Sequence, residues 1–455
     1  MTSTADLRVQ PANYGRGLEA VFLVLAFFVI SDAASIAFYG LRGAAEKSLT
    51  GSNSTRLVTM LAIYAIAAGA MAFRNLRMFG VFLNNPLLLA IALYPLASIL
   101  WASEPDLVFR RAAAHALTIT FVAYLVMNVP GERVLRSFAI ACAIGGVGSL
   151  LLIGAIPGAG VEHSGPNAGS WHGLYGHKAQ VARVAAIAFI CAAAIPVRSH
   201  NDRVLKWIVI ASLAPVLVMS QSRAGWIMVF AGLATWALLV VMRRMNLTPL
   251  LRALLIVGAV AAAVTCILLA EAALLALMGR DERMSGRVSL WRPIFASFQD
   301  HPWLGVGYRS FWTPDGLNDF LPLLAHRGFI PGHGHNGYLD TVAELGLVGV
   351  ALLAAFLVSG FVVGLIESFR RRGNPLAPVC VSCLTVFAIN NYVATVAFEH
   401  SDILWVFAVW SWGTLMVGLR APARQPARSH GLDGDVRRAR GVANAMRAYE
   451  ARPRR

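Results

Sequence analysis

Residues 286–349 form the polar segment around which the chain is organised. They include GRVSLWRP at 286–293, HPWLGVGY at 301–308, HGHNGYLD at 333–340 and AELGLVG at 343–349. Arg, His, Trp and Gly are concentrated here, and the chain has no longer polar interruption before its C-terminal tail. Long ordered connections are usually functional. We therefore expect this segment to carry the chemistry of the protein.

The rest of the chain is strongly apolar. Of its 455 residues 57% are hydrophobic and 14% are charged, whereas a soluble protein has about 25% charged residues. Apolar runs of about 20 residues recur, which predicts an all-α polytopic integral membrane protein. About twelve transmembrane helices are expected, at residues 18–40, 56–73, 80–102, 108–130, 134–156, 179–197, 206–222, 224–242, 250–278, 341–366, 376–397 and 402–419.

The basic residues predict an orientation. The net charge is +16, and the arginines gather in the tail and in alternate short connections between apolar runs, as in a membrane protein rather than a nucleic-acid-binding one. We place the connections that are richest in arginine in the cytoplasm, and the positions of the spans then divide the chain into five expected segments. They are a cytoplasmic N-terminus at 1–17, a bundle of about nine helices at 18–278, an external loop at 279–340, about three helices at 341–420 and a disordered basic cytoplasmic tail at 421–455.

Other classes of membrane protein fit the pattern less well. A secondary transporter or lipid flippase predicts internal repeats and broken helices at mid-membrane, and no clear repeat is visible. A purely structural membrane protein would not need a loop rich in Arg and His. The five Cys all lie inside apolar runs, where packing is their ordinary role.

A second external loop, residues 157–178, ends in SWHGLYGHK. His177 and Lys178 at the mouth of the next span suit a platform for a polar substrate. The alternative is an interfacial aromatic belt with a lysine that reaches the headgroups. Arg183 follows inside that span, and an arginine within a membrane segment is costly enough to make function the first hypothesis.

Three further arginines are candidates for binding an anion. Arg223 lies in a very short external turn, where its planar guanidinium could hold a phosphate. Arg283 and Arg287 are one helical turn apart and could clamp a diphosphate. The alternatives are a helix-end arginine that contacts lipid headgroups and a solvated charged face.

His333 and His335 have the spacing of a metal-binding pair, but no third ligand of fitting spacing follows. A role as general base or hydrogen-bonding group suits His335 better. A helix is expected to begin near Asn336, and a helix N-terminus favours an anion. Asp340 and Glu344 share one face with Asn336, and Glu344 should point into the protein interior.

Together these pieces resemble the bacterial O-antigen ligase and O-antigen polymerase family, which includes exopolysaccharide polymerases. The pieces that match occur in family order, and they are Ser222-Arg223, Gly286-Arg287 with Leu290-Trp291, His301-Pro302 with Gly305-Val306-Gly307, and His335-Asn336-Gly337-Tyr338-Leu339 followed by Glu344-Leu345-Gly346 and Gly349. The loop element Tyr175-Gly176-His177-Lys178 resembles the His-Lys-Asn element of the exopolysaccharide polymerases, with Ala179 in place of the Asn.

The resemblance implies a membrane glycosyltransferase of GT-C-like architecture in the bacterial inner membrane, with its site facing the periplasm. The donor would be a glycan on undecaprenyl diphosphate. The acceptor would be a sugar hydroxyl, on lipid A core for a ligase or on a lipid-linked repeat unit for a polymerase. The anomeric centre would invert, and neither a cofactor nor a metal is expected.

By the same resemblance His335 would be the base or hydrogen-bond partner of the acceptor hydroxyl. Arg223 and Arg287 would hold the diphosphate and stabilise its charge as it leaves. The candidate substrate-binding residues are His177, Lys178, Arg183, Arg283, Trp291, His333 and Asn336. Polymerase and ligase remain open alternatives, including a ligase whose acceptor is a protein, because the acceptor groove need not share a motif.

Overall fold

The structure is a computed structural model. It describes residues 13–40, 54–74, 85–156, 158–163, 167–245, 247–258, 282–317, 332–371 and 373–420. The expected N-terminal segment up to residue 12, most of the expected span at 250–278 and the expected tail at 421–455 lie outside the described residues. The chain divides into a compact unit Met1–Met416 and a second unit Val417–Arg455.

The described residues are helical apart from turns, irregular connections and one isolated antiparallel bridge between Val161 and Trp171. The all-α expectation is therefore confirmed for this part of the chain. The helices are α1 (Asn13–Ile30), α2 (Ser35–Tyr39), α4 (Ser54–Arg74), α6 (Pro86–Ala97), η3 (Ser98–Leu100), α7 (Pro105–Asn128), α8 (Gly131–Ala155), η5 (Gly173–Tyr175), α9 (Lys178–Ala194), α10 (His200–Met219), α11 (Arg223–Arg244), α13 (Glu282–Asp300), α15 (Gly337–Phe369), α16 (Ala377–Val393) and α17 (Ile403–Arg420).

Several helices have the length and composition of membrane spans. Among the described residues four helices are long and apolar enough to cross a membrane, namely Ser54–Ala72, Gly131–Ala155, Arg223–Arg244 and Gly337–Phe369. Shorter apolar helices accompany them at Gly17–Ile30, Pro86–Leu100, Pro249–Gly258, Ala377–Val393 and Ile403–Val417. A chain with this set of helices is suited to crossing a membrane several times.

One expected span differs from the structure. The sequence predicts a single helix over 18–40, but α1 ends at Ile30 and α2 begins at Ser35. Asp32 lies between them with φ of 61°, a left-handed conformation that interrupts a helix. Its carboxylate pairs with Arg56 at 2.8 Å. A tertiary ion pair from α4 thus accompanies a break that the apolar pattern does not reveal.

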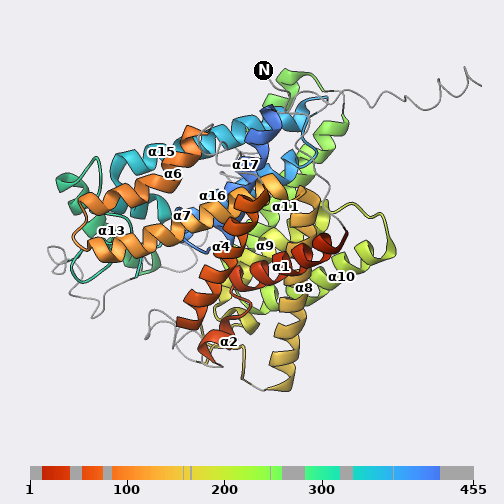
Figure 1. Cartoon of the computed structure of the whole chain (residues 1–455), viewed down its shortest axis with the longest axis horizontal. Helices are drawn as coiled ribbons and strands as arrows, with labels where there is room; N and C mark the ends of the chain where they lie inside the picture. The colour runs from red at the N-terminus through yellow and green to blue at the C-terminus, as the bar shows by residue number, and fades with distance from the viewer. Residues whose placement is uncertain are drawn as a thin grey trace, which may run out of the picture. The chain divides into compact units, whose positions relative to one another are not determined.

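The expected loop at 279–340 contains a regular element. Its described part includes α13, which packs against α15, and α15 in turn packs against α6 (Figure 1). Leu290 and Ile294 of α13 are buried with Phe311 and Trp312 in a small core of their own. This core holds α13 and the following segment against the start of α15.

α15 is bent at Gly346, where the backbone leaves the helical region with φ of 62° and ψ of −163°. The segment that contains Gly305 replaces the broken helical hydrogen bonds. The Val306 and Gly307 amides donate to Ala343 and Glu344 carbonyls at 3.0 and 2.9 Å, and the Leu347 and Val348 amides donate to Pro302 and Trp303 carbonyls at 2.9 and 3.2 Å. Irregular backbone is tolerated within an apolar region when its polar groups are satisfied in this way.

The two glycines make this close approach possible. A Cβ on Gly346 would lie 2.3 Å from the backbone of Trp303, and one on Gly305 would lie 2.5 Å from the carbonyl carbon of Glu344. Gly305 also has φ of 65°. The spacing of glycines in HPWLGVGY and AELGLVG is explained by this interlock of two backbones.

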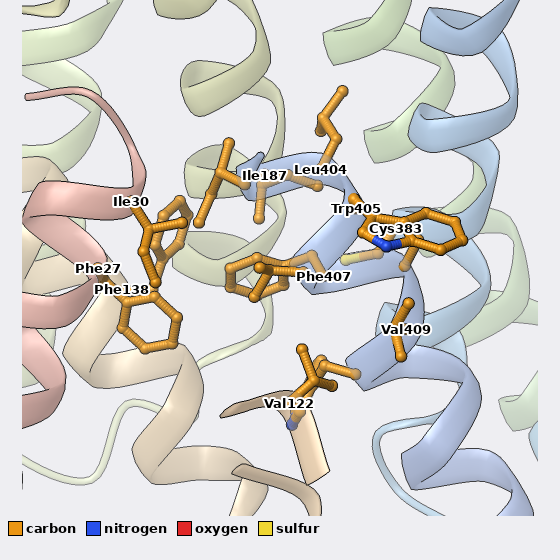
Figure 2. Close-up of a cluster of buried hydrophobic side chains, with 14 of the residues drawn as sticks. Phe27, Ile30, Val122, Phe138, Ile187, Cys383, Leu404, Trp405, Phe407 and Val409 are labelled. Carbon is orange, nitrogen blue, oxygen red and sulfur yellow. The ribbon is translucent and has the colours of Figure 1, made fainter. Parts of the chain in front are cut away.

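Aromatic rings fill the main core, where α1, α8 and α17 meet (Figure 2). The rings of Phe27 and Phe138 lie 5.5 Å apart, and those of Phe138 and Phe407 lie 4.6 Å apart. Trp405, also in α17, is completely buried in the same core. These contacts join the first and last described helices of the bundle.

Ion pairs stabilise the end of the bundle opposite to the candidate site. Arg133 contacts Glu19 at 2.6 Å, and Arg136 contacts Asp202 at 2.5 Å. Asp202 also completes a capping box with Ser199 at the start of α10. Both arginines lie near the start of α8.

Candidate active site

The candidate site lies at the end of the bundle where α9, α11, α15 and α17 begin and α16 ends, which we call the site end. Three contacts join these elements. A Cβ on Gly225 in α11 would lie 2.7 Å from Ala182 in α9. Arg183 of α9 pairs at 2.9 Å with Asp402, which precedes α17. Thr395, in the connection between α16 and α17, donates a hydrogen bond to Asp340 of α15.

His335 occupies a strained position just before α15. Its φ is 53°, in the left-handed region, and its side chain is exposed. A residue other than glycine pays about 1–3 kcal/mol for such a backbone conformation. The surrounding structure must hold it there, and strain of this kind occurs preferentially at functional sites.

The helix after His335 has its own cap. Asn336 is buried, and its side-chain oxygen accepts hydrogen bonds from the amides of Tyr338 and Leu339 at 3.1 and 3.3 Å. Because Asn336 satisfies the first turn of α15, His335 is not needed as a cap. The side-chain oxygen of Asn336 is already engaged in this cap. Substrate binding by Asn336 stays a prediction.

The peptide between the two histidines is held from both sides. The amide of Gly334 donates to the Asp340 carboxylate at 3.0 and 3.1 Å, and the carbonyl of Gly334 accepts from the Trp291 indole at 3.1 Å. Trp312 also donates to Asp340, at 2.9 Å. Trp291, expected as a substrate-binding residue, therefore has an observed role in fixing the histidine segment.

His333 is a neutral imidazole that accepts a hydrogen bond from the backbone of its own segment. Its Nδ1 accepts the backbone amide of His335 at 3.1 Å, so in the neutral ring the proton is on Nε2. Burial, followed by the neighbouring charges of His335 and Arg183, lowers the pKa of His333 to about 3. The rings of His333 and His335 lie edge to face, 4.1 Å apart. The structure brings together the two histidines and Arg183.

His177 has a similar arrangement at the start of α9. It is the N-cap residue, and its Nδ1 accepts the amide of Ala179 at 3.2 Å. Burial, followed by the charge of Arg183, lowers the pKa of His177. The charge of His177 also acts on His333, so both expected loops contribute to the site end. Lys178 is the first residue of α9.

The expected arginines differ in their surroundings. Arg183 is mostly buried and paired with Asp402, which makes it a fixed part of the site wall. Arg223 is the first residue of α11 and exposed, and Ser222 caps that helix by accepting the Gly225 amide at 3.3 Å. The side chains of Arg283 and Arg287 lie outside the described atoms, although both residues belong to α13.

Sequence reasoning missed Arg309. Its φ is 53°, and its guanidinium pairs with Glu399 in the connection between α16 and α17. The charge of Arg309 contributes to the low pKa of His333 and of His400. The available signal was the polar run Glu399-His400-Ser401-Asp402 between two apolar helices, at the same end as the other candidates.

Glu344 is buried, as the sequence analysis expected. Its backbone carbonyl takes part in the α15 interlock through the Gly307 amide at 2.9 Å. The described residues hold no group of three His, Cys, Asp or Glu side chains placed to bind a metal ion. Metal-independent chemistry stays a prediction.

Chemically, the site end offers cations and neutral imidazoles beside apolar helices. Fixed N–H groups and guanidinium groups stabilise an anion that develops during a reaction, particularly where water is excluded. Fold and site together define the class: a helical protein with several apolar helices of spanning length and a polar, cationic site at one end.

Comparison with known proteins narrows this class. Residues 207–354 match the family model Wzy_C, described as O-antigen ligase, which confirms the resemblance drawn from the sequence. The matched segment includes Arg223, α13 and the histidine segment. The chain is also similar to the exopolysaccharide production protein ExoQ of Rhizobium meliloti (strain 1021), with 24% identity over 373 residues, 78% of this chain and 81% of that protein.

Proposed function

We propose that the protein is a membrane glycosyltransferase of surface polysaccharide assembly. It would transfer a glycan from undecaprenyl diphosphate to a sugar hydroxyl, with inversion and without a metal. The family match and the similarity to an exopolysaccharide production protein support the polysaccharide context. The donor and acceptor classes come from the resemblance of the sequence motifs to the O-antigen ligase and O-antigen polymerase family.

The observation that carries the proposal is the grouping at the site end. His333 lies within the electrostatic influence of Arg183, Arg309 and His177, although these residues are far apart in the sequence, and its ring lies 4.1 Å from that of His335. A lipid diphosphate is already a good leaving group. Fixed positive charge and correct positioning can therefore supply most of the catalysis.

In the proposed step His335 accepts the proton of the acceptor hydroxyl. The hydroxyl oxygen attacks the anomeric carbon from the face opposite to the diphosphate, and the new C–O bond forms as the bond to the diphosphate oxygen breaks. Undecaprenyl diphosphate leaves with that electron pair. Arg223 and Arg287 stabilise its added charge, while His177, Lys178, Arg183, Arg283, Trp291, His333 and Asn336 line the substrate site or hold its walls.

The proposed architecture is GT-C-like, with about twelve spans in the bacterial inner membrane, both termini in the cytoplasm and the site end in the periplasm. The location of the polar groups at one end of the helices supports this orientation over a mid-membrane transport site. A cysteine introduced at Ser285 should react with an impermeant reagent in spheroplasts, whereas one at Ser429 should not. The reverse pattern would invert the topology.

Polymerase and ligase are both retained. The similarity to ExoQ along most of both chains supports a role in exopolysaccharide production, and the description of the family model names a ligase. A deletion strain separates them by its surface glycans. Loss of long chains with single repeats still transferred indicates a polymerase. Loss of all repeats from lipid A core, with polymer left on the lipid carrier, indicates a ligase. Unchanged glycans would contradict both.

A further inference from the structure

We propose that Asp340 is a positioning residue that holds the His333-Gly334-His335 segment in its reactive geometry through hydrogen bonds rather than through chemistry of its own. The inference rests on the proposed function, in which His335 takes the proton of the acceptor. Asp340 itself is completely buried.

The carboxylate of Asp340 is a common acceptor for three separate elements. It accepts the Gly334 amide of the histidine segment, the Trp312 indole of the segment after α13 and the Thr395 hydroxyl of the connection before α17. All three partners donate. A charged carboxylate, which only accepts, matches this set and forms stronger hydrogen bonds than a neutral group.

The position of Gly334 leaves little room for adjustment. A Cβ at this residue would lie 2.5 Å from an Asp340 carboxylate oxygen, 3.0 Å from Ile294 and 3.1 Å from Trp312. The Trp291 indole donates to the opposite side of the same peptide, at 3.1 Å. The peptide is therefore fixed by side chains from α13, α15 and the segment between them.

Fixing Gly334 also fixes His335. The His335 amide follows directly and donates to His333 at 3.1 Å, and the left-handed φ of 53° is unfavourable without such support. On the other side Asn336 begins α15 with its own cap. Without the Asp340 hydrogen bonds, the strained residue would be free to relax and carry its imidazole away from the acceptor.

Substitutions at Asp340 separate positioning from chemistry. In Asp340→Asn the remaining oxygen can still accept from Gly334 and Trp312, and the new amide can donate to the Thr395 hydroxyl, which can rotate to accept. Asp340→Ala removes all three acceptor contacts. Thr341→Val is the matched control, because Thr341 is the next residue of α15, is buried, and its hydroxyl donates within its own helix, to the Gly337 carbonyl at 2.6 Å.

The assay is glycan transfer by the purified full-length protein from a lipid-diphosphate donor in defined detergent or liposomes. Asp340→Ala should lower kcat about 100-fold with the donor KM nearly unchanged, since a misplacement of about 1 Å can cost that much. Asp340→Asn should keep kcat within about fivefold of the parent, and Thr341→Val should be unaffected. Equal, large losses in the Asn and Ala variants would show that the charge takes part in chemistry and would overturn the proposal.

Hydrogen–deuterium exchange gives a readout that does not depend on catalysis. In peptides that cover residues 332–337, the Gly334 amide should exchange faster in Asp340→Ala than in the parent and remain protected in Asp340→Asn. Unchanged exchange in Asp340→Ala would show that Asp340 does not hold the segment. If the exchange pattern is as expected but the parent transfers no glycan, the proposed function fails and the positioning role stands.

If Asp340→Ala does not insert into the membrane, Trp312→Phe and Thr395→Val each remove a single donor to the same carboxylate. Each should increase exchange at Gly334 and lower kcat a few-fold, as expected for one hydrogen bond. Parent-like exchange and kcat in both would contradict the shared anchoring of the segment.

Discussion

The interlock between Gly346 and the segment around Gly305 makes a quantitative prediction about Gly346→Ala. At φ of 62° and ψ of −163° the backbone lies in a region that is essentially confined to glycine, so an alanine there costs about 1–3 kcal/mol. Its Cβ would also lie 2.3 Å from the backbone of Trp303, which cannot move as a flexible side chain would. Overpacking typically adds about 1–3 kcal/mol, so the total loss should be about 2–6 kcal/mol.

The effect should be visible as a lower unfolding temperature of the detergent-purified protein and a lower yield from membranes. Gly154→Ala is the control, because a Cβ there meets no heavy atom within 4 Å in the helix α8, and alanine in a helix is about 0.5–1 kcal/mol more favourable than glycine. Gly305→Ala should disrupt the same interlock from the other backbone, because its Cβ would lie 2.5 Å from the Glu344 carbonyl carbon.

The two damaging substitutions should be less than additive, because either one alone separates the same pair of backbones. Glycan transfer should fall with stability in both, since the α15 turn that follows the histidine segment depends on this contact. Gly346→Ala with the stability of Gly154→Ala would refute the interlock as a source of stability.

Four further outcomes are expected. His335→Asn should fold, because Asn tolerates a left-handed backbone. Its kcat should fall about 10²- to 10⁴-fold for lack of a base. Near-normal surface glycan on cells that carry this variant would show that the role of His335 is structural. Arg223→Lys should recover little of the loss seen in Arg223→Ala, about 2–4 kcal/mol of transition-state stabilisation, and Arg287→Lys should behave alike, because a lysine lacks the planar fork; full rescue by Lys would argue against a diphosphate clamp. Burial, followed by the charges of His335, Arg183, Arg309 and His177, lowers the pKa of His333, which binds a proton near pH 6.5 when unfolded but only at about 3 when folded, so its contribution to stability falls as pH is lowered through that window. The unfolding temperature of His333→Gln should therefore change less between about pH 7 and pH 5 than that of the parent, and equal slopes would contradict the lowered pKa. Exhaustive chelation should leave transfer activity intact, and activity lost to chelation and restored by a divalent ion would make the histidine pair a metal site.

Much of the site could be anticipated because its residues lie at the ends of apolar runs. His333, His335, His177 and Arg223 were placed at one end of the helices by counting spans and basic residues, and the structure puts them at that end. Their individual roles were less accessible. Substrate binding by Trp291 and Asn336 stays a prediction. The structure adds that the Trp291 indole holds Gly334 and that the side-chain oxygen of Asn336 caps the first turn of α15.

Contacts between distant segments account for the residues that were missed. Arg309 follows a glycine turn in the sequence, and only the fold brings it to Glu399 and to the electrostatic surroundings of His333. Asp340 was recognised as a member of one helix face, but its role as an acceptor for Gly334, Trp312 and Thr395 depends on three separate elements. No local pattern encodes such a meeting.

The sequence by itself determined the helical class, the positions of most apolar helices and the end at which the polar groups lie. These properties follow from local composition, because an apolar run of sufficient length forms a helix with its backbone satisfied internally. The tertiary structure alone decided the break at Asp32, the bend at Gly346 and the geometry of the histidine segment. Each of these depends on backbone angles and hydrogen bonds between residues far apart in the chain, and a bend is favourable only where a second segment satisfies the backbone groups that it releases.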